Sequence, residues 1–343
     1  EILPGELADG GWWEPAAAIE RWQRGELLLA PPVIVILRQL ERGIDTGTIE
    51  SLRSSPETFE ESGLAIPWGP GIELLPFHCP PLPVTLPSST FLAGTRRFVI
   101  IDPAPTGEKE QEHLLAAIEN RIAGGDRPEA IVLSHHHIDH VGALDAVQKR
   151  WSLPCWGHRR TAELLKRSFD RELDEGDLID LGDSPAGTSG WKLRCLFTPG
   201  HAEGHLAFFD ELHHALLAGD LVSTLVSMYV GTPGGHLETY FRSLEKIRRL
   251  DIRLLYPSHG MPTLDARGLI DRTIEHRKKR IEQIRGKLEK GFHSVDEIAG
   301  EVYRAEADSR LQPLYERTTR AALEYLVEHE QARKLEEDLY ETG

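Results

Sequence analysis

Four histidines and one aspartate stand close together in the segment 131–147, IVLSHHHIDHVGALDAV. They directly follow an apolar, β-branched run, so the sequence predicts that they lie in the loop at the end of a strand. His135 and His137 are two residues apart, and in extended backbone their side chains project to the same side. Because imidazole and carboxylate groups bind zinc and similar divalent ions, the segment predicts a metal site.

Three further ligand-type residues follow apolar runs elsewhere in the chain: His201 in FTPGHAEGHLAFF, Asp220 in LLAGDLV and His259 in LLYPSHGMP. A single His or Asp at a strand end is usually a solvated or turn-forming residue. Four loops of the same character are better explained by a shared site, since sites on α/β scaffolds lie in such loops. Together these loops hold more ligands than one tetrahedral ion needs.

The elements that must position these residues alternate between strand and helix. Short apolar runs predict strands, and apolar residues at helical spacing predict helices. The predicted strands are 97–102, 130–134, 191–198, 205–210, 214–220 and 252–257, and the predicted helices between some of them are 110–122 and 141–151. This alternation predicts an α/β fold with layered sheets.

The motifs SHHHIDHVG, TPGHAEGH, LLAGDLV and YPSHG, in this order, resemble those of the metallo-β-lactamase-fold hydrolases. The separations of 61, 19 and 39 residues between His140, His201, Asp220 and His259 are also family-like. The resemblance spans roughly residues 71 to 264 and implies an αββα sandwich with the metals at one edge, between the sheets. It implies one ion held by His135, His137 and His201, a second held by Asp139, His140 and His259, and Asp220 as the bridge.

Such a site favours hydrolysis. Two ions about 3.5–4 Å apart can share a hydroxide and polarise the oxygen of the attacked group. Seven ligands with only two carboxylates leave the pair of dications positively charged, which favours an anionic transition state. Asp139 is the expected catalytic residue, orienting the hydroxide and shuttling a proton. The expected cofactor is Zn²⁺, two ions per chain, with Mn²⁺ or Fe²⁺ as alternatives.

Three other histidines near these motifs are expected to have structural roles. His136 alternates away from its neighbours, which favours packing or hydrogen bonding over metal binding. His205, at the end of GHAEGH, is expected to be hydrogen-bonded. His236 precedes an expected helix, and a role at the helix N-terminus is favoured over contact with substrate.

Four units are expected along the chain: a Nudix-like remnant (1–42), a linker (43–70), the catalytic domain (71–267) and a winged-helix-like C-terminal domain (268–343). The first unit is expected to contain a strand, a helix near Pro15 to Arg24 and a second helix after Pro31. It resembles the C-terminal end of a Nudix hydrolase domain but lacks the glutamate-rich, magnesium-binding box, so no catalysis is assigned to it. The chain begins with Glu1 rather than Met, which leaves room for an upstream segment.

The C-terminal unit resembles that of the beta-lactamase-like protein 2 group. TIEHRKKRIEQIRGKLEKG resembles the helix that leaves the catalytic domain, and HSVDEIAGEVY and TTRAALEYLVEHEQARKLE resemble the later helices. Ser294 and Glu297 have the spacing of a capping box. The group includes a single-stranded-RNA endonuclease and relatives with ester- or thioester-type activity.

Composition and charge restrict the partners. The net charge of −16 argues against an extended duplex nucleic acid as a partner. Residues 272–290 hold eight Lys or Arg against three Glu, which favours either a path for a short single-stranded RNA or a solvated helix with ion pairs. No apolar run is long enough to span a membrane. Three scattered cysteines without CxxC spacing predict a cytoplasmic location.

Three functions remain open at this level. The first is a metal-dependent hydrolase acting on a small-molecule ester, thioester or lactone, which the acidic composition and the metal loops favour. The second is a metal-dependent endoribonuclease acting on single-stranded RNA. The third is a mononuclear iron oxidase or dioxygenase on the same fold. The loops expected to shape the pocket carry no substrate signature, and the sequence does not indicate an oligomeric state.

Overall fold

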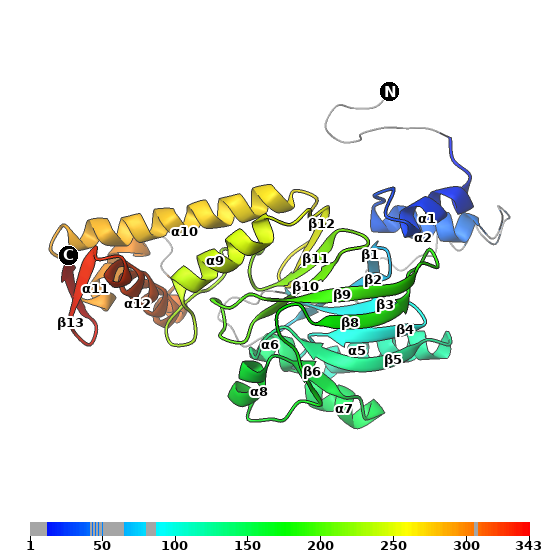
Figure 1. Cartoon of the computed structure of the whole chain (residues 1–343), viewed down its shortest axis with the longest axis horizontal. Coiled ribbons are helices and arrows are strands. Elements are labelled where there is room, and N and C mark those ends of the chain that lie inside the picture. Colours follow the sequence, from blue (N-terminus) through cyan, green and yellow to red (C-terminus); the bar gives the residue numbers. More distant parts are fainter. Residues whose placement is uncertain are drawn as a thin grey trace.

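The computed structural model of the 343-residue chain describes residues 12–41, 43, 45, 47, 50, 65–79, 87–304 and 308–343. Two β-sheets lie face to face, and helices cover the outer face of each (Figure 1). This is the αββα sandwich that the family resemblance implies, and the layered α/β fold that the alternation of elements predicts. A helical C-terminal part extends the layer of helices on one side.

The first sheet has seven strands in the order β1 to β7. The pairs from β1 to β4 are antiparallel, and those from β4 to β7 are parallel. The strands are β1 (Ile66–Gly69), β2 (Ile72–His78), β3 (Pro87–Gly94), β4 (Arg97–Ile101), β5 (Arg127–Leu133), β6 (Cys155–Gly157) and β7 (Arg171–Glu172). Because β1 pairs with β2, the sheet begins inside the segment that the sequence assigns to the linker 43–70.

The second sheet has five strands in the order β12-β11-β10-β9-β8. Only β11 and β12 are parallel among its pairs. The strands are β8 (Leu178–Asp183), β9 (Ser189–Phe197), β10 (Leu206–Asp210), β11 (Ala215–Gly219) and β12 (Leu254–Pro257). The six strands predicted from the sequence are all present, with ends shifted by at most three residues.

The layers follow from apolar residues on both faces of the strands. In β4, Val99 and Ile101 pack in the core between the sheets, whereas Phe98 and Ile100 pack against helices on the outer face. A strand covered on both sides is expected to be a continuous apolar run, as residues 98–101 (FVII) of β4 are. The helices of this side are α5 (Glu108–Ala123), α6 (Ile138–Val141), α7 (Leu144–Trp151) and α8 (Arg159–Leu165).

The second sheet packs against helices that continue into the C-terminal part. One apolar cluster joins the outer face of this sheet to α9, α10, α11 and α12. Their bounds are α9 (Leu237–Arg248), α10 (Ala266–Leu288), α11 (Val295–Val302) and α12 (Gln312–Glu328), with a short 3₁₀ helix at Ser309–Leu311. Ser294 and Glu297 form the predicted capping box at the start of α11.

The chain ends in an antiparallel hairpin of β13 (Ala332–Glu336) and β14 (Leu339–Thr342). The helical prediction for residues 332–336 is therefore wrong. A strand with one buried face shows alternating apolar residues, but this one is exposed at Arg333, Lys334, Leu335 and Glu336 and shows no such alternation. Its conformation is determined by pairing with β14. The winged-helix resemblance of this part stays a prediction.

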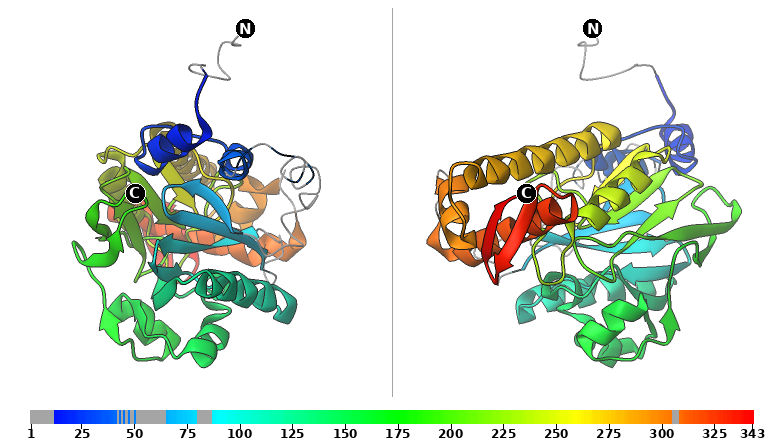
Figure 2. Two further views of the ribbon diagram at one scale, coloured as in Figure 1. Left: turned by 90° about the vertical axis from the view of Figure 1, so that its right-hand side faces the viewer. Right: turned by 60° about the vertical axis from the view of Figure 1, so that its left-hand side comes forward.

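Two helices, α1 (Pro15–Gln23) and α2 (Pro31–Leu40), form a small N-terminal unit. Each begins with Pro, whose fixed φ suits the first helical turn. They share a cluster around Trp22 and Ile34, and Figure 2 shows them away from the C-terminal hairpin. Residues 12–14 form no strand, so the predicted strand is absent there; the residues before Trp12 lie outside the described part. The Nudix resemblance stays a prediction.

No helix in the described part of the chain combines the length and the apolar character needed to cross a bilayer.

Candidate metal centre

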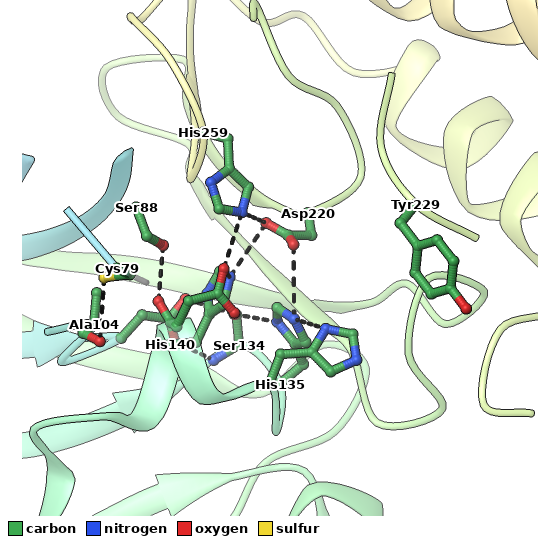
Figure 3. Close-up of polar contacts among 12 residues, drawn as sticks. Cys79, Ser88, Ala104, Ser134, His135, His140, Asp220, Tyr229 and His259 are labelled. Carbon is green, nitrogen blue, oxygen red and sulfur yellow. Dashed lines mark hydrogen bonds and ion pairs between the residues drawn. The ribbon is translucent and has the colours of Figure 1, made fainter. Parts of the chain in front are cut away.

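The candidate site lies at one edge of the sandwich, where several strands end in loops. These loops bring together all seven residues that the sequence predicts as metal ligands. Figure 3 labels His135, His140, Asp220 and His259 among them. Four of them follow β5, and the others follow β9, β11 and β12. They form two groups, within each of which the ligand atoms lie within 4.8 Å of one another: His135, His137, His201 and Asp220, and then Asp139, His140 and His259.

In the first group three imidazole nitrogens and one carboxylate oxygen converge. His137 Nδ1 lies 2.9 Å from His135 Nε2 and 2.9 Å from His201 Nε2. Asp220 Oδ2 lies 3.3 Å from His201 Nε2 and 3.8 Å from His135 Nε2. A single shared proton could join only two of these nitrogens, whereas a cation binds the lone pairs of all three.

The second group faces the other oxygen of the same carboxylate. Asp220 Oδ1 lies 3.3 Å from His140 Nε2 and 3.4 Å from His259 Nε2. Asp139 Oδ2 lies 3.4 Å from His259 Nε2 and 4.0 Å from His140 Nε2. The two oxygens of Asp220 therefore face two different sets of donors, which is the arrangement that a bridging carboxylate requires.

The geometry and the donors fit divalent ions. Neighbouring donors on a tetrahedral ion with bonds of about 2.0–2.2 Å lie roughly 3.3–3.6 Å apart, close to the separations found here. Two buried atoms, His140 Nε2 and Asp220 Oδ1, have no hydrogen-bond partner in the described part of the chain. Orphaned buried polar atoms are rare and call for an unseen partner. The His/Asp donor set indicates a divalent metal cofactor.

Burial sets the protonation of the first group. It lowers the pKa of His135 and of His201 well below the usual histidine value, and it lowers the pKa of His137 to about 4. These three imidazoles are therefore neutral near pH 7. Neutral imidazole is the form that offers a lone pair to a metal ion.

Charge balance dominates the second group. Burial by itself would lower the pKa of His140, but the carboxylates of Asp220, Asp139 and Asp102 raise it well above the usual value. Burial would likewise raise the pKa of Asp220, but His259 and His140 hold it well below the usual value. The buried carboxylates of this group require a positive charge beside them. In the metal-free protein a proton on His140 supplies this charge, and a bound metal ion would take its place.

Hydrogen bonds on the far side of the rings aim the Nε2 atoms at the centre. Nδ1 of His201 lies 2.6 Å from the carbonyl oxygen of Tyr229, and Nδ1 of His259 lies 3.0 Å from that of Pro87. Nδ1 of His140 lies 2.9 Å from Asp102 Oδ2. Carbonyl and carboxylate acceptors fix the Nδ1–H tautomer and leave the Nε2 lone pair free.

Asp102 is a functional residue that the sequence analysis missed. Its buried carboxylate also accepts hydrogen bonds from the backbone N–H and the hydroxyl of Ser134, at 2.7 and 2.5 Å. It thereby joins the end of β4 to the loop after β5. Asp102 is the last residue of the predicted strand 97–102, just as Asp220 is the last residue of the predicted strand 214–220. An aspartate directly after an apolar run was therefore the sequence signal that could have identified Asp102 as a site residue.

Two of the other histidines near the motifs, His205 and His236, have the structural roles that the sequence predicts. His205 is hydrogen-bonded on both sides: its Nδ1 lies 2.9 Å from Thr198 Oγ1, and its Nε2 accepts from the backbone N–H of Asp220 at 3.0 Å. His236 caps α9, where its Nδ1 accepts from Thr239 N. His136 belongs to neither ligand group.

The fold and this cluster define a class, the αββα sandwiches with a His/Asp metal cluster in the loops at one edge. Residues 82–259 match the model of the metallo-beta-lactamase superfamily, and the chain belongs to this superfamily.

Relatives agree with this membership. The beta-lactamase-like protein 2 homolog of Caenorhabditis elegans is 30% identical over 60% of this chain and 66% of its own length. The atrochrysone carboxyl ACP thioesterase of Aspergillus fumigatus is 25% identical over 57% of this chain and 58% of its own length. The chain thus spans about three-fifths to two-thirds of these relatives.

A solved structure shows the same fold. The beta-lactamase domain protein from Burkholderia ambifaria superposes with a TM-score of 0.70 at 20% identity, over 84% of this chain and 96% of that one. The superfamily model ends at residue 259. Because the superposition covers 84% of the chain, it also includes residues of the C-terminal part.

Proposed function

We propose that this chain is a dinuclear zinc hydrolase that cleaves a small carboxylic thioester or ester. The observation that carries the proposal is the position of Asp220, whose two oxygens each lie 3.3–3.4 Å from an imidazole nitrogen of a different group. A carboxylate placed between two sets of donors would be able to bind one ion with each of its oxygens. His135, His137 and His201 would hold the first ion, and Asp139, His140 and His259 the second.

The side chains themselves determine the charge of the loaded site. Two carboxylates, Asp139 and Asp220, against two dications would leave a net positive charge in a largely buried cluster, which favours an anionic transition state. When bound, the ions would supply a hydroxide nucleophile at neutral pH and an electrophile for the carbonyl oxygen. Asp139 is the proposed catalytic residue, because its carboxylate lies among the donors of the second group, 3.4 Å from His259 Nε2, where it can orient the nucleophile and move its proton.

Zinc fits the donors best. They are imidazole and carboxylate without thiolate, a set that also admits Mn²⁺ and Fe²⁺. Cys79 is the thiol drawn beside the site in Figure 3, and it points instead at the carbonyl oxygen of Ala104, 3.5 Å away. Burial raises the pKa of Cys79 to about 12, so it stays a thiol. All three cysteines are free and buried, which supports the proposed cytoplasmic location.

The loops beside the ligands support an acyl substrate over RNA. No Asp, Glu, Lys or Arg occurs between Asp220 and Glu238 or between Arg253 and Asp265. A nucleic-acid strand requires cations along its path. The relative named as a thioesterase also supports acyl chemistry.

The basic helix adds little to an RNA hypothesis, because much of its charge is already paired. Within α10, Arg272 pairs with Asp265 and Arg285 with Glu282. Lys287 pairs with Glu301. Arg277 is buried under the ring of Tyr240. These contacts support the solvated helix with ion pairs that the sequence analysis gives as the alternative.

The test combines metal analysis with hydrolysis. Protein purified without added metal is expected to hold about two zinc ions per chain. It should hydrolyse an acetyl thioester of N-acetylcysteamine, and Asp139→Asn should lower kcat by about 10²–10⁴-fold. Asp145→Asn is the matched control, since Asp145 lies exposed on α7 and pairs with Arg167.

Three results would contradict the proposal. The first is cleavage of a labelled single-stranded RNA, lost in Asp139→Asn, without thioester hydrolysis, which would identify an endoribonuclease. The second is one iron ion per chain with oxygen consumption, which would identify an oxidase or dioxygenase. The third is equal activity in Asp139→Asn and Asp145→Asn, which would remove Asp139 from the chemistry.

A further inference from the structure

Three exposed apolar side chains stand beside the metal centre. Leu225 is 50%, Val226 40% and Met261 53% exposed. They lie in the loops that follow two of the proposed ligands: Leu225 and Val226 come five and six residues after Asp220, and Met261 comes two residues after His259. Large apolar residues grouped on a surface mark a binding site more often than isolated ones do.

Hydrogen bonds tie these two loops into one platform. Ser223 Oγ donates to the carbonyl oxygen of His259 at 2.9 Å and accepts from the N–H groups of Leu225 and Val226 at 3.0 and 3.2 Å. Thr224 Oγ1 donates to the carbonyl oxygen of Met261 at 3.0 Å. The apolar side chains are therefore presented on a backbone that is anchored to a ligand residue.

The two loops also touch through a glycine next to His259. A Cβ atom on Gly260 would lie 2.2 Å from Thr224 Oγ1 and 3.0 Å from Leu225 Cγ. Gly260 has a φ of +105°, which side chains other than glycine rarely adopt. The close approach places the Leu225 side chain beside the backbone that carries His259, and so joins the apolar surface to the metal site.

The chemistry of this surface selects an uncharged, apolar ligand. Residues 221–235 and 260–264 include no acidic or basic residue, so a phosphate or a carboxylate would find no cationic partner among them. A dimer interface is disfavoured by size, because stable interfaces bury about 800 Å² or more per partner, and three side chains cover far less. The apolar tail of a substrate whose reactive carbonyl lies at the metals satisfies both conditions.

We propose that Leu225, Val226 and Met261 form a seat for the acyl chain of the substrate, so that medium-length acyl thioesters are preferred over acetyl. The proposal deepens the function proposed above and rests on it. A fully buried methylene gains about fourfold in affinity, and one covered on a single side gains roughly twofold. Four added methylenes, from acetyl to hexanoyl, should then raise kcat/KM by about 16-fold.

The experiment measures chain-length preference and binding separately. Zinc-loaded full-length protein is given acetyl, butyryl and hexanoyl thioesters of N-acetylcysteamine, and binding of the non-hydrolysable hexyl thioether is measured by calorimetry. Leu225→Asn should reduce the hexanoyl-to-acetyl ratio of kcat/KM and the affinity for the thioether by about fourfold each. Leu212→Asn is the matched control, since Leu212 is a 43% exposed leucine in the turn between β10 and β11, at the other end of these strands.

The outcomes separate the two proposals. Equal hydrolysis of all three thioesters would overturn the seat and leave the hydrolase intact. Binding of the hexyl thioether that depends on Leu225, without hydrolysis of any thioester, would support the seat and refute the thioesterase. A dimer in solution that Leu225→Asn dissociates would show that these side chains join two copies of the chain, and would also overturn the seat.

Discussion

The strongest single test of the metal centre is the substitution Asp102→Asn. Asp102 lies outside the sequence motifs that predict the metal ligands. Its Oδ2 atom nevertheless faces both the hydroxyl of Ser134 and Nδ1 of His140. The φ of Asp102 is +51°, in the left-handed region. Asparagine tolerates this region, whereas alanine would add backbone strain to any electrostatic effect.

The expected effect follows from the tautomer of His140. The amide oxygen of Asn can keep the hydrogen bond from Ser134 N, and its NH₂ group then replaces Oδ2. An NH₂ donor facing His140 favours the tautomer that carries its proton on Nε2. That atom is the one that lies 3.3 Å from Asp220 Oδ1, and a protonated nitrogen offers no lone pair to an ion.

The loss can be stated as an affinity. Removing an outer partner of a metal-bound histidine typically weakens metal binding by about 10–100-fold. This corresponds to about 1.4–2.7 kcal/mol at 1.36 kcal/mol per tenfold change. Losing charged hydrogen bonds should also lower the free energy of unfolding of the metal-free protein by about 1.5–3 kcal/mol.

Competition with a chromophoric chelator measures zinc affinity, and urea unfolding measures stability. Asp210→Asn is the control, because Asp210 is another buried aspartate, the last residue of β10, at the end of this strand away from the metal centre. Its Oδ2 atom lies 2.7 Å from Nδ1 of His213. This substitution should destabilise the fold and leave zinc affinity unchanged. Wild-type affinity for both ions in Asp102→Asn, or equal losses in the two variants, would refute the role assigned to Asp102.

Three other predictions concern the supports of the site and of the C-terminal part. Gly219→Ala would place a Cβ atom 2.4 Å from His205 Nε2, at a backbone φ of +55°. It should lower the free energy of unfolding, measured with urea, by about 2–4 kcal/mol and should lower the zinc content. A variant with full zinc content and wild-type stability would contradict this prediction. Chelation of the metal should lower Tm by about 5–10 °C in calorimetry, and added zinc should restore the original Tm. The reason is that an ion whose free concentration is 100 times its Kd stabilises the folded protein by about 2.7 kcal/mol. Ser294→Ala should remove the cap of α11 and cost about 1 kcal/mol in urea, with zinc content unchanged; loss of zinc would instead connect α11 to the site.

Much of the fold was predictable because the strands of the core are strongly patterned. FVII (98–101), AIVL (130–133) and LAFF (206–209) are apolar over their whole length, as is expected of strands in a sheet covered on both faces. β3 lacked this signal, since its first half reads PSST. Its polar side chains are buried because their partners come from elsewhere: Ser88 Oγ donates to Asp139 O, and Thr90 Oγ1 donates to Asp102 O.

The limits of the units were less predictable because they depend on pairing and packing. β1 lies in the expected linker, and its place in the sheet depends on its register with β2. α10 begins near the predicted boundary at 267/268, but its buried residues belong to the same apolar cluster as the outer face of the second sheet. The composition of a segment does not reveal which neighbour covers it.

The sequence by itself determined the identity of the donors. Ligand chemistry is a property of residue type, and short spacings such as that of His135 and His137 restrict local geometry strongly. The tertiary structure decided what long separations leave open: which oxygen of Asp220 faces which group, which ring nitrogens point inward, and that Asp102 stands behind His140. These facts depend on β4, β5, β11 and β12 ending at one edge of the sandwich, and strand order across two sheets is set by the packing of the whole core rather than by any one segment.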